Sequence, residues 1–111
     1  MNILEKAKEL GRELYNTEEY QRLQEVTKKV NEDSDALQLL QSFKEAQHTI
    51  QFLQQTGVQP TEEQIADYQN KRKNLESNLN LLAYRKATED FYAVMKQVNE
   101  AISAGIEGKE D

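Results

Sequence analysis

Glu45 and His48 are the residues whose types and spacing come closest to a reactive pair. Three positions apart on a helix, they would lie on adjacent turns, and Glu-x-x-His supplies half of the ligands in di-iron carboxylate bundles. His48 is the single histidine, so only two facing copies could complete such a site. Both side chains are expected to point away from the apolar stripe of their helix, which favours an exposed histidine beside an ordinary glutamate. A dimer-assembled, ferritin-like metal site stays the alternative, and we predict no cofactor.

Other catalytic arrangements find little support in the sequence. The chain has no cysteine, which excludes disulfides, thiolate metal sites and a cysteine nucleophile. Its four glycines form no phosphate-binding pattern, and one histidine gives a Ser/His/Asp arrangement little basis. The adjacent carboxylates suit helix starts or solvated faces. We therefore predict no catalytic residues and no enzymatic activity.

Positive charge concentrates in one stretch, at Lys71-Arg72-Lys73 and again at Arg85-Lys86. Tyr68 and Tyr84 flank it, and bases can stack on aromatic rings between cations, so an RNA-associated helper is a second alternative. However, acidic residues at helical spacings can pair with these cations. The formal net charge of −6 and the pI near 4.9 also argue against direct nucleic-acid binding.

The overall composition describes a thin helical protein. The 111 residues are 37% hydrophobic and 31% charged, which suits one domain with a modest core. No apolar run approaches the roughly 20 residues that span a bilayer, and the first residues lack a signal-peptide pattern. We expect a cytoplasmic protein without membrane insertion, with one helical domain over residues 1–104 and a frayed acidic tail over 105–111.

Apolar residues recur at helical spacing along most of the chain, and good helix formers dominate. Helices are predicted over about 2–14, from 18 to near 31, and from 36 to about 55. Thr61 with Gln64 forms a capping-box pattern that starts a helix at Glu62. Asn16 and Thr17 can cap the second helix, and the third follows the cap cluster Asp33-Ser34-Asp35.

The last helical stretch, from Glu62 to about Ala104, changes its apolar face by roughly 100° on a helical wheel. The change falls beside Ser77, Asn78 and Asn80, which favour helix caps, so a kink or break is predicted near 77–80. The fold is therefore all-α: two short N-terminal helices followed by a long antiparallel helical hairpin.

Several apolar side chains lie off the main stripes and are not obviously buried within the chain. Soluble monomers rarely leave broad apolar patches open, so we predict a homo-oligomer, a dimer or a tetramer. The alternative is that the short N-terminal helices fold back over these positions. The predicted contact residues are Leu37, Phe52, Leu81, Tyr84, Tyr92 and Met95.

The order of helical segments and loops along the sequence resembles that of the YlbF/YmcA family of small helical proteins from Gram-positive bacteria. The resemblance rests on four segments: Ala7–Gly11 with Thr17–Tyr20, Leu39–Gln47, the loop with Gly57 and Pro60, and Asn80–Phe91. It implies a non-enzymatic regulatory or adaptor protein that acts through contacts with other regulatory proteins. Family members are linked to control of competence, biofilm formation and sporulation. Some members bind iron–sulfur clusters through cysteines, which this chain lacks.

Overall fold

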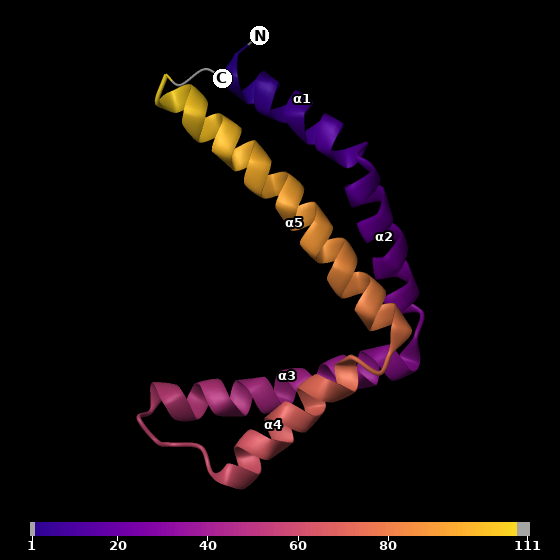
Figure 1. Cartoon of the computed structure of the whole chain (residues 1–111), viewed down its shortest axis with the longest axis vertical. Helices are drawn as coiled ribbons and strands as arrows, with labels where there is room; N and C mark the ends of the chain where they lie inside the picture. The colour runs from indigo at the N-terminus through magenta and orange to yellow at the C-terminus, as the bar shows by residue number, and fades with distance from the viewer. Residues whose placement is uncertain (1, 109–111) are drawn as a thin grey trace. The chain divides into compact units, whose positions relative to one another are not determined.

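The computed structural model describes residues 2–108, and those residues form five α-helices without strands (Figure 1). This confirms the all-α prediction. The helices are α1 (Ile3–Tyr15), α2 (Glu18–Asn31), α3 (Ser34–Gln55), α4 (Glu62–Leu75) and α5 (Leu79–Ile106). Helix α5 extends two residues further than predicted, to Ile106, and residues 109–111 of the predicted tail lie outside the described part of the chain.

Side chains cap the helix starts where the sequence indicates. The Thr17 hydroxyl accepts the Tyr20 N–H at 3.2 Å, and Asp33 accepts the Ala36 N–H at 3.1 Å. Thr61 and Gln64 form the complete capping box, with reciprocal hydrogen bonds of 2.9 and 3.1 Å. Each cap satisfies backbone donors that have no partner inside the helix, which fixes where the helix begins.

The predicted interruption of the last helical stretch is a break rather than a bend. Helix α4 ends at Leu75 and α5 begins at Leu79. The Ser77 hydroxyl donates to the Asn74 carbonyl at 2.6 Å, and the Asn78 side-chain oxygen accepts the Leu81 N–H at 3.0 Å. One side chain thus closes the end of α4 and another caps the start of α5.

The chain divides into two compact units, and α2 and α5 contribute to both. The first unit comprises residues up to Val26 together with those from Tyr84 onward, and the second comprises Thr27–Ala83. In the second unit, α3 and α4 lie against each other as a helical hairpin (Figure 1). The predicted long hairpin is therefore shorter, because α3 pairs with α4 while most of α5 belongs to the first unit. That residues 1–104 act as one domain stays a prediction.

Each unit has its own small set of buried side chains. In the second unit Val30, Ala36 and Leu81 are buried together, and Leu39, Leu40 and Leu75 pack around them. In the first unit Val26 and Ala87 are buried, and the Tyr20 ring meets the Phe91 ring of α5 with centroids 5.1 Å apart. No residue of α1 is buried. The first unit is consequently thin and leaves much of its apolar surface in water.

Candidate protein-contact surface

The most exposed of the predicted contact residues lies on α5. The Tyr92 side chain is 72% exposed, although its ring carries a large apolar surface. It stands at one end of an open groove of about 460 Å³ that continues along α5 to Glu107, the residue that follows the helix. Met95, half-buried, also lines the groove, so two of the predicted residues lie together on one surface.

The other predicted contact residues are distributed over both units. Tyr84 belongs to the first unit with Tyr92 and is partly exposed. Leu37 and Phe52 belong to the second unit, on α3, and Phe52 is 60% exposed near the end of that helix. The structure thus describes two candidate surfaces, one in each unit.

Leu81 does not share this exposure. Only 6% of its surface is accessible, because it packs against Val30 and Ala36 in the second unit. The sequence places Leu81 off the main stripe of its helix, but its neighbours there come from α2 and α3 of the same chain. We therefore assign Leu81 to the core.

Glu45 and His48 lie exposed on α3, one turn apart. The Gln41 side-chain amide donates to one oxygen of the Glu45 carboxylate at 3.0 Å. Among the described residues, no three His, Asp or Glu side chains come close enough to hold a metal ion. A metal site at this pair would still depend on ligands from a second copy.

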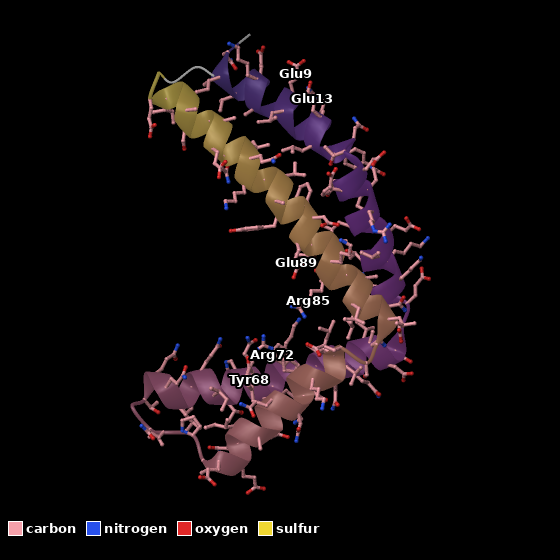
Figure 2. All side chains as sticks on the ribbon, in the orientation of Figure 1. Glu9, Glu13, Tyr68, Arg72, Arg85 and Glu89 are labelled. Atoms are coloured by element: carbon pink, nitrogen blue, oxygen red, sulfur yellow. The ribbon has the colours of Figure 1, made fainter. Side chains whose placement is uncertain are left out.

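Acidic neighbours balance much of the basic stretch. Lys71 pairs with Asp67 at 3.1 Å and Arg85 pairs with Glu89 at 3.2 Å, the latter visible in Figure 2 on adjacent turns of α5. Lys86 lies 3.5 Å from the Asp90 carboxylate. All three are i,i+4 pairs of exposed or partly exposed side chains, as the sequence spacing suggests. Lys71 belongs to the second unit and Arg85 to the first.

Asp33 has a role that local sequence patterns do not reveal. One carboxylate oxygen caps α3, while the other accepts hydrogen bonds from the Asn78 and Asn80 side-chain amides at 3.2 and 2.9 Å. The Ala36 backbone N–H, followed by the Asn80 and Asn78 amides, holds the pKa of Asp33 below its ordinary value. This bridge ties the start of α3 to the start of α5 and gives the second unit its shape.

The groove residues beyond Met95 are also absent from the sequence-based prediction. They include Lys96, Asn99, Glu100 and Ser103, which are polar and therefore lie outside any search for uncovered apolar side chains. Their spacing of three and four residues is the available signal, because it places them on one face of a helix with Tyr92. In the described part of the chain, no helix has the combination of length and hydrophobicity that crossing a bilayer requires.

Comparison with known proteins agrees with the resemblance seen in the sequence. Residues 3–107 match the family described as "Control of competence regulator ComK, YlbF/YmcA". A UPF0342 protein of Limosilactobacillus reuteri is 31% identical over 107 residues, which cover 96% of this chain and 87% of the relative. UPF0342 proteins of Streptococcus mutans and Streptococcus pyogenes are 31% and 30% identical, with 95% and 92% of their lengths covered.

The fold also has a solved counterpart. A chain in the crystal structure of Bacillus subtilis RicA in complex with RicF superposes with a TM-score of 0.80. The match covers 96% of this chain and 94% of that one at 16% sequence identity, so it shows that the two chains share a fold. Together with the family match over nearly the whole chain, these comparisons show that the protein belongs to the YlbF/YmcA family.

Proposed function

We propose that this protein is a non-enzymatic regulatory adaptor that acts by binding other helical proteins, including further copies of itself. The observation that carries the proposal is the Tyr92 ring on α5, which is 72% exposed at one end of an open groove. A tyrosine ring exposed to water contributes no burial of apolar surface to the stability of a monomer, whereas protein interfaces are enriched in tyrosine.

The family supports the same conclusion. Its description names control of a competence regulator, a task of regulation rather than catalysis. The structurally similar Bacillus subtilis chain comes from a complex of RicA with RicF, which is an assembly of two proteins. We infer that this protein likewise works inside assemblies and regulates processes such as competence, biofilm formation or sporulation in the cytoplasm.

Native mass spectrometry of the purified protein tests this function, first alone and then mixed with other YlbF/YmcA proteins of the same bacterium. We expect a metal-free dimer or tetramer, a mixed complex, or both. Phe52→Glu and Tyr92→Glu should reduce these species, since each puts a charge into an apolar contact. Gln51→Glu and Gln97→Glu are the matched controls, because each adds the same charge to the same helix as its target residue, at an exposed polar position.

Two results would contradict the proposal. The first is a protein that stays monomeric and forms no mixed complex at any concentration tested. The second is a dimer that carries iron in fixed ratio and loses it in His48→Ala, which would favour the metal site instead.

A further inference from the structure

The groove on α5 has an unusual construction, because seven of the eight residues that line it belong to this one helix and the eighth, Glu107, directly follows it. They recur at intervals of three and four residues from Tyr92 to Glu107, which is one continuous face about four turns long. Such a face is open along its whole length to another helix. Side-chain size differs between the two ends of the groove, and its centre carries both a positive and a negative charge. These properties indicate which helix could bind there.

The two ends of the groove complement each other in shape. Tyr92 projects at one end with a largely exposed ring, whereas Ser103 and Ala104, one turn before the other end at Glu107, have two of the smallest side chains. A large side chain needs a hollow in the facing helix, and small side chains provide one. A second copy running in the opposite direction would place each tyrosine over the small residues of its neighbour.

The centre of the groove is complementary in charge. Lys96 and Glu100 lie there one turn apart, between the tyrosine and the small residues. In an antiparallel arrangement, Lys96 of one copy would face Glu100 of the second copy, and the reverse contact would form as well. A two-fold symmetric interface repeats every contact in this way.

One register satisfies both conditions. Val98 lies two residues after Lys96 and two before Glu100, and it also lies six residues after Tyr92 and six before Ala104. We propose that two copies of this chain pair through α5 in antiparallel orientation, with the two-fold axis crossing the face of Lys96 and Glu100 at the level of residue 98 along the helix. The occupant of the groove is therefore α5 of a second copy, an inference that rests on the proposed function.

The outer contacts of this register are compatible with pairing. Glu107 would lie opposite Glu89 of the second copy, but Arg85 already balances that carboxylate at 3.2 Å. One helix from each copy buries less than the roughly 800 Å² per partner of a standard stable interface. We therefore expect a dimer that dissociates in the micromolar range and can exchange its partner.

Single cysteines test the orientation, because the natural chain contains none. Residue 99 is one position from the axis, so its two copies would be offset by about 3 Å along the helices and Asn99→Cys should form a disulfide-linked dimer. Residue 107 is nine positions away, which gives an offset of about 27 Å. Glu107→Cys lies on the same face and should stay monomeric under the same mild oxidation.

Charge exchange tests the register. Lys96→Glu places like charges together twice per dimer, so we expect its dissociation constant in sedimentation to rise about tenfold. The double variant Lys96→Glu/Glu100→Lys restores both contacts and should recover most of that loss. Lys8→Glu on α1 changes the net charge equally and is the control.

The outcomes separate this inference from the proposed function. Cross-linking of Glu107→Cys as readily as Asn99→Cys would overturn the antiparallel pairing. A wild-type dimer that neither cysteine traps and that Lys96→Glu leaves intact would assign self-association to another surface, while the adaptor function would stand. A strictly monomeric protein that still binds another family member would overturn this inference alone.

Discussion

The two units of the chain hold themselves together in different ways. The second unit joins distant segments through the polar bridge at Asp33 and through three side chains buried beside it. The first unit is held by ring contacts, such as Tyr20 with Phe91, and by stripes of half-buried side chains. Directional hydrogen bonds fix one geometry, whereas a partly open apolar layer gains stability when something covers it. This difference supports our proposal that α5 in the first unit presents a contact surface.

The largest effect is expected from a cavity in the core of the second unit. Leu81→Ala should lower the free energy of unfolding by about 2 to 4 kcal/mol, because it leaves a cavity beside Val30 and Ala36. Leu82→Ala is the matched control, since that side chain is 39% exposed and should cost about 1 kcal/mol or less. Urea unfolding measures both values. Equal losses for the two variants would mean that Leu81 is no more buried than its neighbour.

Alanine substitutions at two glycines, one in each unit, should change the stability of the protein by smaller amounts and in opposite directions. Gly57, in the loop of the second unit, has φ of +77°, which a side chain disfavours, so Gly57→Ala should destabilise the protein by about 1 kcal/mol. Gly11 lies within α1 of the first unit and has open space around an added Cβ atom. Gly11→Ala should therefore stabilise the protein by about 0.5 to 1 kcal/mol. Thermal unfolding in parallel would detect the opposite signs, and a shared sign would contradict this account.

The third prediction concerns the pH dependence of the Asp33 bridge. Because the pKa of Asp33 is lowered in the folded protein, its carboxylate stabilises the fold above the ordinary carboxyl pKa of about 3.9. That contribution is lost as the pH falls through the lowered pKa. The stability difference between wild type and Asp33→Asn should thus be largest near neutral pH and shrink in acid.

Asp35→Asn removes a carboxylate from the first turn of the same helix and serves as the control for this titration. Urea midpoints between pH 2 and pH 7 would measure the stability of the wild type and of both variants. A difference for Asp33→Asn that stays constant across this range would mean that its carboxylate is not held in the charged form by the bridge.

Local sequence patterns predict the elements of this fold well. The capping box at Thr61 and the asparagines near Asn78 act within a few residues of their own helix, so their effect is visible in the sequence. The interruption between α4 and α5 follows from the same local chemistry.

Local sequence patterns do not predict which helices pack against one another. A helical wheel shows that Leu81 points away from the main stripe but not that α2 and α3 cover it. Likewise, the bonds from Asp33 to Asn78 and Asn80 join residues 45 and 47 positions apart, which no local pattern contains. The groove on α5 was missed for a third reason, since polar residues make up most of its length.

The Asp33 bridge also has a consequence for the order of events in folding. Closing a chain segment of that length costs substantial entropy unless something shortens it first. The α3–α4 hairpin is such a device, because it turns through the short loop around Gly57 and brings the two ends of the segment back together. We therefore expect the hairpin to form early and the bridge late. In stopped-flow measurements, loss of the bridge should accelerate unfolding and leave the folding rate nearly unchanged.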